Sequence, residues 1–310
     1  MFFISQDKLP VITERYTITN CFYSILKFYK IFYKILTSTG ICSIKKYALL
    51  DLTLIRMVSP MEGKTQCAKI EVKNLTMRFD SLTVLDKIHF SVNEGELVSI
   101  VGPTGCGKTT FLNCLSGLTA PTAGEILIDG EKANPRKHNL AFVFQESTCL
   151  PWRSVRENVA FGMEAKGVPR KERLARADAI MEMAGLLSCA DLYPKQVSAS
   201  MLQRIAVSRA FAVHPDLLLL DEPYGQLDVK LRIYLEDELV KLWKNLKSTI
   251  IFITHNIEEA VYISQRVIVL SPKPTTVKAD IPIDLPMPRS LISPEFIKLR
   301  KQITDLIRWW

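Results

Sequence analysis

The stretch GPTGCGKTT, residues 102–110, decides the fold class because it fits the pattern G-x-x-x-x-G-K-S/T. It is preceded by GELVSIVG (95–102), a short apolar run that predicts a strand. It is followed by KTTFLNCLSGL (108–118), whose apolar spacing is that of a helix. A strand, a glycine-rich loop and a helix in this order predict a phosphate-binding loop rather than an ordinary tight turn.

The residue types in this loop suit the chemistry of a nucleoside triphosphate. Glycines allow backbone N–H groups to close around phosphate oxygens, and the helix N-terminus adds a favourable dipole. Lys108 is expected to reach the β- and γ-phosphates, and the Thr109 hydroxyl to bind Mg²⁺. The expected nucleotide contacts of the loop are Gly102, Pro103, Thr104, Gly105, Cys106, Gly107, Lys108, Thr109 and Thr110.

A second motif lies about 110 residues further on, in LLLLDEP (217–223). Asp221 would hold Mg²⁺ and Glu222 would accept the proton of the attacking water as general base. Alone, two carboxylates at a strand end would also suit a solvated strand terminus, but the phosphate loop makes the catalytic interpretation the stronger one. His255 ends the run TIIFITH (249–255) and could polarise the γ-phosphate, although a single histidine at a strand end is more often structural.

The alternation of strands and helices predicts a layered α/β domain with a mostly parallel sheet. LAFVFQ (140–145), LLLLDEP and TIIFITH are continuous apolar runs, as expected for strands covered on both faces. Residues 153–190 lack a strand pattern and predict two amphipathic helices, at 154–167 and 170–186. A last helix is expected to begin with Ser293 as N-cap and Pro294 in its first turn.

The ordered motifs resemble those of the nucleotide-binding subunits of ABC transporters, over about residues 66–310. They comprise the phosphate loop, Phe144–Gln145, QVSASMLQR (196–204), LLLLDEPYGQLD (217–228) and THNIEEA (254–260). The resemblance implies a P-loop NTPase (RecA-like) α/β core with an N-terminal antiparallel β portion. It also implies a helical signature subdomain at about residues 150–202 and a C-terminal helix at about 294–308.

The resemblance further implies roles for single residues. Phe79 would stack on adenine, although a plain core aromatic is the alternative. Gln145 would sense Mg²⁺ and the attacking water, so that Lys108, Gln145, Glu222 and His255 form the catalytic set. The Mg²⁺ ligands would be Thr109, Gln145 and Asp221. Asp228 would communicate across a dimer, and a helix beginning at Ser198 would contact the γ-phosphate of ATP bound to the opposite subunit.

Finer features resemble importer ATPases for nitrate, sulfonates, taurine and thiamine-precursor pyrimidines. They are LPWRSVRENVAFGME (150–164), DEPYGQLD (221–228) and the tail DIPIDLPMPRS (280–290). The implied partners are integral-membrane permease subunits, a second ATP-binding subunit (an identical chain or a paralogue) and, indirectly, a solute-binding protein. The implied location is the cytoplasmic face of the cell membrane. The transported solute is selected by the partners and is not encoded in this chain.

One motif departs from the family pattern. Where the family reads LSGG, this chain has Val197-Ser198-Ala199-Ser200. A Cβ at Ala199 or Ser200 is expected to crowd the partner's γ-phosphate or to strain a position of positive φ by roughly 1–2 kcal/mol. A cost of about 1.4 kcal/mol slows a reaction about tenfold. The chain is therefore expected to be an active but slowed ATPase. The alternative is an ATP-binding regulatory or degenerate subunit with little hydrolysis, against which the retention of Glu222 argues.

Charge and cysteine content narrow the class of partner. The chain has 40 Lys and Arg against 32 Asp and Glu, or +8, but residues 1–60 contribute +5 of it, from eight basic and three acidic residues. The remaining 250 residues carry only +3, so a nucleic-acid partner is not expected. Seven cysteines without a CxxC pair indicate free thiols rather than disulfides or a zinc site.

The first 60 residues contain ten of the 27 aromatic residues. CFYSILKFYKIFYKILTSTG (21–40) has lysines three and four residues apart, the pattern of a basic amphipathic helix on an anionic membrane. The favoured interpretation is a start codon placed too early, since Met57 and Met61 precede the first strand expected at 68–79, and the membrane-surface helix is the alternative.

Overall fold

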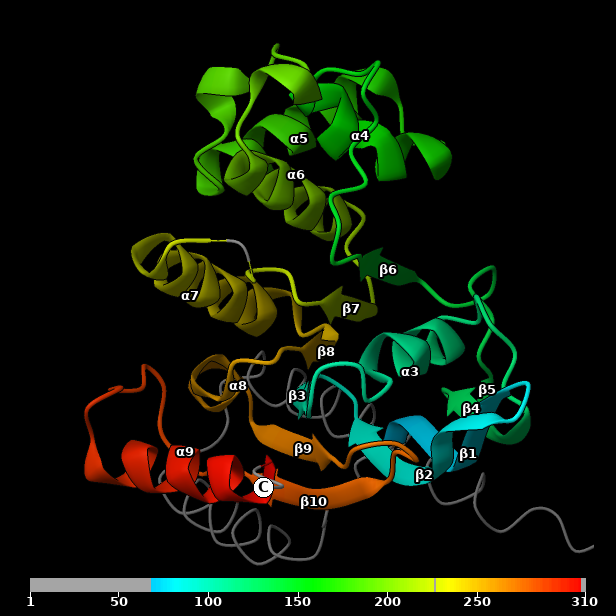
Figure 1. The fold of residues 1–310 in the computed structure, drawn as a ribbon. Coiled ribbons are helices and arrows are strands. Elements are labelled where there is room, and N and C mark those ends of the chain that lie inside the picture. Colours follow the sequence, from blue (N-terminus) through cyan, green and yellow to red (C-terminus); the bar gives the residue numbers. More distant parts are fainter. Residues whose placement is uncertain (1–67, 226, 308–310) are drawn as a thin grey trace, which may run out of the picture. The chain divides into compact units, whose positions relative to one another are not determined.

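The computed structural model describes residues 68–225 and 227–307. The expected N-terminal extension, residues 1–60, lies outside these described residues. Within them the strands form two sheets, one of six strands and one of four. The α/β fold class is confirmed by this arrangement (Figure 1).

The six-stranded sheet has the order β10-β9-β3-β8-β7-β6, and all its pairs are parallel except β9–β10. Its strands are β3 (Leu97–Val101), β6 (Leu140–Val143), β7 (Leu217–Asp221), β8 (Thr249–Ile253), β9 (Arg266–Leu270) and β10 (Val277–Pro282). Every residue of β3, β7 and β8 is buried, which explains their unbroken apolar sequences.

The sequence of β7 shows how one strand serves two cores. Leu217 and Leu219 pack in one hydrophobic cluster with helix α3 (Lys108–Leu115). Leu218 and Leu220 pack in another, with helix α7 (Val229–Leu246). Successive side chains of a strand point to opposite faces, so helices cover both sides of this sheet. The carboxyl end of β7 thereby delivers Asp221 to a fixed place beside the phosphate loop.

The smaller sheet is antiparallel, with the order β2-β1-β4-β5. Its strands are β1 (Ala68–Phe79), β2 (Leu82–Asn93), β4 (Ala123–Ile128) and β5 (Glu131–Lys132). Apolar residues of this sheet share a cluster with α3, so the phosphate loop lies where the two sheets meet.

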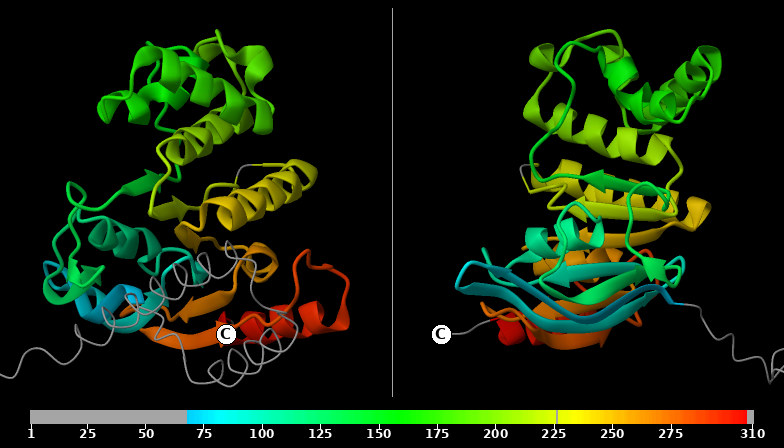
Figure 2. Two further views of the ribbon diagram at one scale, coloured as in Figure 1. Left: turned by 180° about the vertical axis from the view of Figure 1, so that it is seen from behind. Right: turned by 90° about the vertical axis from the view of Figure 1, so that its right-hand side faces the viewer.

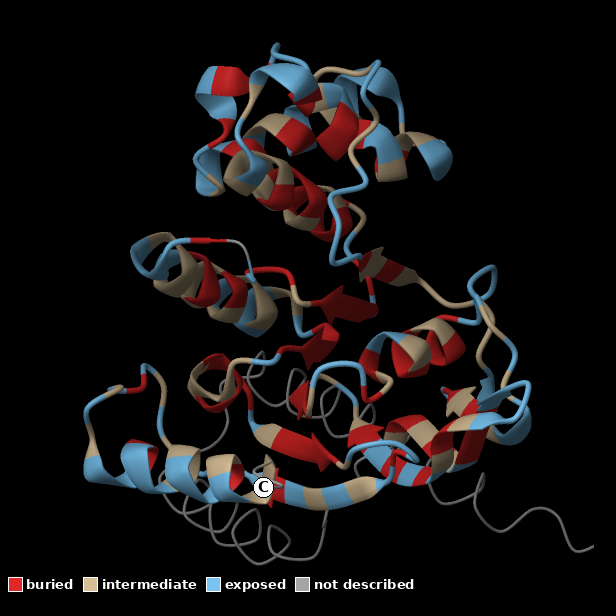
Figure 3. Cartoon of the chain, in the orientation of Figure 1, coloured by how far each residue is buried: buried red, intermediate tan, exposed pale blue. Residues whose placement is uncertain are grey.

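Three helices, α4 (Val155–Ala165), α5 (Arg170–Met183) and α6 (Ala199–Ala212), gather beyond β6 at one end of the described residues (Figures 1 and 2). Short 3-10 turns at Leu187–Cys189 and Pro194–Gln196 lead from α5 to α6. The three helices have a core of their own, formed by residues such as Val159, Met181 and Ile205. Helix α6 also contributes Phe211 to the core of the large sheet and so joins the two. Figure 3 shows the buried positions of α6 in red.

Helix α3 is shorter than the periodicity of residues 108–118 predicted. It ends at Leu115, and Gly117 follows with a φ of +74°. A Cβ at Gly117 would lie 2.7 Å from Pro135 Cδ, so the chain turns at a position that only glycine fills easily.

The C-terminal part begins with helix α8 (Ile257–Ile263) and ends with α9 (Pro294–Ile307). Ser293 Oγ accepts the backbone N–H of Phe296 at 3.2 Å, which confirms the predicted N-cap. The intervening segment is held by Arg289, whose buried guanidinium donates to five carbonyl oxygens, those of Val261, Tyr262, Ser264, Ile283 and Leu285. Burial lowers the pKa of Arg289 to about 10.

Candidate active site

The phosphate loop joins β3 to α3, and its glycines fit because of their surroundings. Gly107 has a φ of +117°, and a Cβ there would lie 2.8 Å from Val84 Cγ1 and 3.1 Å from Leu85 Cδ2. Any other residue would push strand β2 away from the loop. Gly105 has a φ of +75° with open space around it, so there the conformation rather than the room requires glycine.

Lys108 starts α3 and its side chain folds back over the loop. Its Nζ donates to the carbonyl oxygens of Gly102 at 2.9 Å and Pro103 at 3.1 Å. The first-turn N–H groups of a helix have no acceptor within the helix, so those of α3 are free to bind an anion. Lys108 and these groups together place positive charge on one side of the loop, as a polyphosphate requires.

The phosphate loop is also held by Thr275, a contact that no sequence pattern indicated. Thr275, fully buried between β9 and β10, donates its hydroxyl to the carbonyl of Cys106. Its backbone N–H donates to Val84 O at 2.9 Å, and its carbonyl accepts Asp86 N–H at 2.8 Å. Thr275 therefore ties the phosphate loop to strand β2.

The carboxylates at the end of β7 lie beside this loop. Asp221 is buried, which raises its pKa, while a hydrogen bond from Thr109 and the charge of Lys108 oppose the increase. The Oε2 atom of Glu222 lies 3.1 Å from His255 Nδ1 and accepts Gln145 Nε2 at 3.3 Å. The φ of Glu222 is +47°, a conformation that costs a non-glycine residue energy and is frequent at functional sites.

A cavity of about 640 Å³ opens over the loop. It is lined by Phe79, Leu82, Val84, Thr104, Gly105, Gly107, Lys108, Thr109, Thr110, Gln145, Glu222, His255 and Lys273. Phe79 is 49% exposed and lines this cavity, so it is not the core aromatic that the sequence left as an alternative. Lys273, on the β9–β10 connection, was missed because no motif marks it.

A second cavity of about 190 Å³ is lined by Gln145, Gln203, Glu222, Gly225 and His255. Gln203 belongs to α6, and its buried Nε2 has no hydrogen-bond partner among the described residues. This side chain places α6 at the same cavity as the carboxylate of Glu222, an arrangement that no sequence motif indicated.

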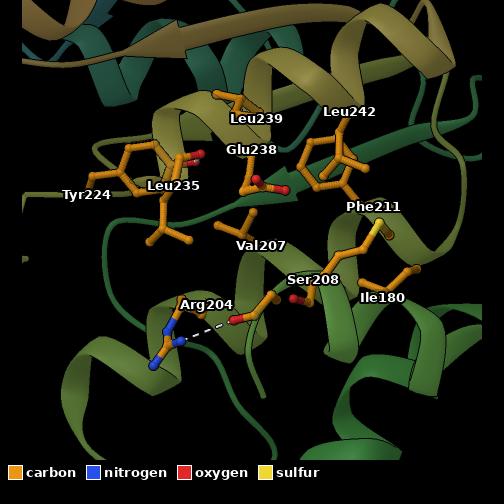
Figure 4. A pocket seen from close by; sticks show the side chains of 12 residues that line it. Ile180, Arg204, Val207, Ser208, Phe211, Tyr224, Leu235, Glu238, Leu239 and Leu242 are labelled. Carbon is orange, nitrogen blue, oxygen red and sulfur yellow. Dashed lines mark hydrogen bonds between the residues drawn. The ribbon is translucent and has the colours of Figure 1, made fainter. Parts of the chain in front are cut away.

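A third cavity, between α5, α6 and α7, is of another kind (Figure 4). Its volume of about 40 Å³ is too small for a nucleotide, and its lining is mostly apolar, with Val207, Phe211, Leu235 and Leu239. At its edge Arg204 donates to the carbonyl of Ala184 at 3.0 Å. It is therefore a packing gap between helices and not part of the candidate site.

The signature residues lie apart from the phosphate loop of the same chain. Ser198 caps α6, accepting Met201 N–H at 3.3 Å, and neither it, Ala199, Ser200 nor Asp228 lines the described cavities. Ser198 and Ala199 are exposed. Asp228 is exposed too and caps α7 through Leu231 N–H at 3.0 Å.

The expectation that Ala199 or Ser200 strains a positive φ is wrong for this chain. Both residues lie in the first turn of α6, and neither has a positive φ. A helix start is a conformation that Ala and Ser adopt freely. Any cost of the two side chains must therefore arise from contact with another molecule at this exposed helix end.

The residues brought together can bind and hydrolyse a phosphoanhydride. A loop of N–H donors and Lys108 would receive the phosphates, and Glu222, which lines the same cavity, carries a carboxylate that can accept a proton. The side chains of Thr109, Gln145 and Asp221 offer oxygen atoms, the donors that Mg²⁺ prefers. The chemistry of this donor set therefore fits Mg²⁺.

Comparison with known proteins agrees with this geometry. The family model described as ABC transporter matches residues 85–225. An uncharacterized ABC transporter ATP-binding protein of Methanocaldococcus jannaschii is 42% identical over 244 residues, 77% of this chain and 91% of that protein. A nitrate import ATP-binding protein of Synechocystis sp. is 37% identical (74% and 89% covered), and an aliphatic sulfonates import ATP-binding protein of Bacillus cereus is 39% identical (72% and 88%).

Solved structures give the same result. A dimeric ABC transporter cassette matches with a TM-score of 0.65 at 32% identity, covering 70% of this chain and 99% of that one. The same cassette bound to ADP and Pi in a post-hydrolysis state matches with a TM-score of 0.63 at 31% identity. The chain belongs to the ABC transporter family, as an ATP-binding subunit with ATPase activity. Among its described residues, no helix is both long and apolar enough to cross a membrane.

Proposed function

We propose that this chain drives a membrane importer for a small solute of the nitrate, sulfonate or taurine kind, or a thiamine-precursor pyrimidine. It does so at the cytoplasmic face of the membrane, bound to permease subunits that receive solute from a solute-binding protein. The observation that carries the proposal is the meeting of Gln145 and His255 on one oxygen of Glu222, beside a complete phosphate loop. The import functions of the relatives from Synechocystis and Bacillus cereus support the direction of transport.

Each catalytic side chain has a task that its position permits. Lys108 and the loop N–H groups bind the phosphates and hold them in line. Glu222 accepts a proton from the attacking water, while Gln145 and His255 orient its carboxylate and the water. Mg²⁺, held by Thr109, Asp221 and Gln145, would neutralise charge on the phosphates. Phe79, exposed at the end of β1, offers a ring face to the adenine.

A second ATP-binding subunit would complete the site. The exposed start of α6 at Ser198 and the exposed Asp228 lie away from the chain's own phosphate loop, where a partner subunit can meet them. Two chains related by twofold symmetry would each offer α6 to the ATP of the other. Gln145, which lines the catalytic cavity, leads along the chain into α4, so ATP-driven closure would move the helical segment that faces the permease.

The altered signature would slow this cycle without abolishing it. Two Cβ atoms at an exposed helix start would crowd the γ-phosphate of the partner's ATP, whereas the Ser200 hydroxyl would return one hydrogen-bond donor. The catalytic side chains do not depend on this helix start, so hydrolysis would continue at a reduced rate.

The test is ATP hydrolysis by the chain with its permease in lipid vesicles, with and without solute-loaded binding protein. Candidate solutes are nitrate, a short alkyl sulfonate, taurine and an aminopyrimidine. Stimulation by one of them, absent in Lys108→Met, is the expected result. MgATP binding with no hydrolysis in any mixture would instead indicate a regulatory subunit.

A further inference from the structure

Charged side chains, buried or partly buried, join helices α7 and α8 next to the turn that contains His255. Arg232 and Glu236 lie one turn apart on α7, and Glu259 lies on α8. Arg232 Nε lies 3.4 Å from Glu259 Oε1 and 3.8 Å from Glu236 Oε1. The side chains of Glu236 and Glu259 are only 3% and 5% exposed, so solvent screens these charges little.

Glu259 contacts both neighbours of His255. Thr254 Oγ1 donates to Glu259 Oε2 at 2.5 Å, and Asn256 Nδ2 donates to Oε1 at 3.4 Å. The turn is closed further by Asn256 N–H, which donates to Thr254 Oγ1 at 2.9 Å. Glu259 thus fixes the backbone on either side of His255, and the imidazole is left to contact Glu222.

The same carboxylate is linked to the segment that carries Asp228. Arg232 belongs to the first turn of α7, and its N–H donates to the carbonyl of Asp228 at 2.9 Å. One ion pair, between Arg232 and Glu259, therefore connects the start of α7 with the turn of His255. Gly225, three residues before Asp228, lines the second cavity together with Glu222 and His255.

The charges in this cluster are uneven, with two carboxyl groups and one guanidinium. Glu259 accepts hydrogen bonds from Thr254 and Asn256 and pairs with Arg232, whereas Glu236 Oε1 is buried without a hydrogen-bond partner. Burial, followed by the charge of Glu259, raises the pKa of Glu236 to about 8. Burial also raises the pKa of Glu259, and the hydrogen bond from Thr254 and the charge of Arg232 oppose that increase.

The other groups facing the cluster are satisfied elsewhere. The Tyr224 hydroxyl donates to Leu235 O at 3.3 Å, Asp237 accepts the Tyr262 hydroxyl at 2.8 Å, and Glu258 pairs with Arg300 at 2.8 Å. None of them replaces Arg232 as the partner of Glu259.

We propose that Glu259 is a positioning residue for His255, and that its ion pair with Arg232 couples the placement of His255 to that of the Asp228 segment. The proposal rests on the proposed roles of His255 at the γ-phosphate and of Asp228 at the partner subunit. It gives the buried carboxyl group of Glu259 a role, because an acceptor shared by several donors defines one geometry of the turn.

The experiment is a double-mutant cycle on ATP hydrolysis by the full chain. Glu259→Gln keeps the shape of the side chain but loses its charge. We expect kcat to fall about tenfold with the Kd for ATP within twofold, because the catalytic geometry rather than nucleotide binding is disturbed. In the background of His255→Ala, the same substitution should have almost no further effect, since its influence passes through His255.

The matched control is Glu258→Gln on the same helix, which breaks the half-exposed pair with Arg300 and should leave kcat within twofold. Arg232→Met should reproduce the loss seen in Glu259→Gln, and Arg232→Lys should restore part of it. If Glu259→Gln fails to fold, Thr254→Val tests the same contact.

Two negative outcomes are distinguishable. A tenfold loss that persists in His255→Ala would overturn the positioning role, because Glu259 would then act independently of His255. An unchanged kcat in His255→Ala alone would instead remove the proposed role of His255 itself.

Discussion

His255 Nδ1 lies 3.1 Å from Glu222 Oε2, at the atom that Gln145 Nε2 also approaches, to 3.3 Å. One carboxylate oxygen is thus held by two side chains, each of which follows the end of a strand, β6 or β8. In the proposed mechanism, this arrangement orients the carboxylate that accepts the proton of the attacking water.

The substitution Glu222→Gln should leave ATP binding intact and lower kcat by about 10²–10⁴, the usual contribution of a general base. The amide cannot accept the proton, yet it can keep a contact with His255. Binding of a fluorescent ATP analogue and release of phosphate measure the two effects. A kcat reduced less than tenfold would assign the base to another group.

Restoring glycine at both altered signature positions, Ala199→Gly/Ser200→Gly, should raise kcat about tenfold, if removal of the two side chains is worth roughly 1.4 kcal/mol at the closed state. Glycine weakens a helix by up to about 1 kcal/mol, so a small loss of stability is expected too. Ala165→Gly, at the exposed end of α4, controls for that loss. An unchanged rate would mean that the side chains do not impede closure.

Replacement of Phe79 by Ala should weaken ATP binding about tenfold or more, since stacking of a base on an aromatic ring is worth roughly 1–3 kcal/mol. Phe79→Trp should retain affinity and report binding through its fluorescence. Phe161→Ala, an exposed aromatic of α4, is the control. Equal affinities for ATP in Phe79→Ala and the control would exclude stacking.

The pKa of Glu236, raised from 4.5 to about 8 by burial and Glu259, predicts a pH dependence of stability. Between these two values the folded chain binds one more proton than the unfolded chain. The free energy of unfolding therefore falls as pH rises from about 4.5 to 8, by up to about 1.4 kcal/mol per pH unit from this group.

Glu236→Gln removes the titrating group, so the free energy of unfolding should change less between pH 4.5 and 8. The variant should therefore be more stable than the parent near pH 8. Urea unfolding at several pH values measures it. Glu238→Gln on the same helix, where the carboxylate pairs with exposed Lys241, should keep the parent slope.

Arg289→Met should lower the free energy of unfolding by on the order of 3 kcal/mol, because several buried carbonyl oxygens lose a charged donor. Arg300→Met, which breaks a half-exposed ion pair, should cost less than about 1 kcal/mol. The denaturant midpoints of the two variants give the two losses in the free energy of unfolding. Equal losses would contradict the stabilising role of the hydrogen bonds that Arg289 donates.

The sequence predicted the parts of the site that local patterns encode. The phosphate loop lies between a strand and a helix, and Asp221 and Glu222 lie at the end of a buried strand, because unbroken apolar runs identify central strands without ambiguity. Because β3, β8 and β7 are parallel neighbours, the residues that follow their carboxyl ends lie at the same edge of the sheet.

Contacts between distant segments were not predictable in this way. No sequence motif marks Thr275 or Gln203. The fold brings the carbonyl of Cys106 to Thr275 and places Gln203 in the cavity that Glu222 lines. The expected strain at Ala199 and Ser200 was wrong because a glycine pair suggested an unusual backbone, whereas the helix simply starts there. In the proposed dimer, a requirement for small residues would come from contact with the ATP of the partner subunit.

The anchoring of Cys106 by Thr275 spans 169 residues and has a consequence for biosynthesis. The chain emerges from the ribosome N-terminus first, so the glycine-rich loop is made long before the threonine that fastens it to β2. Nascent chains that end between His255 and Thr275 carry every proposed catalytic side chain but lack this anchor. The contacts that fasten the phosphate loop to β2 are therefore completed only after residue 275 has been made.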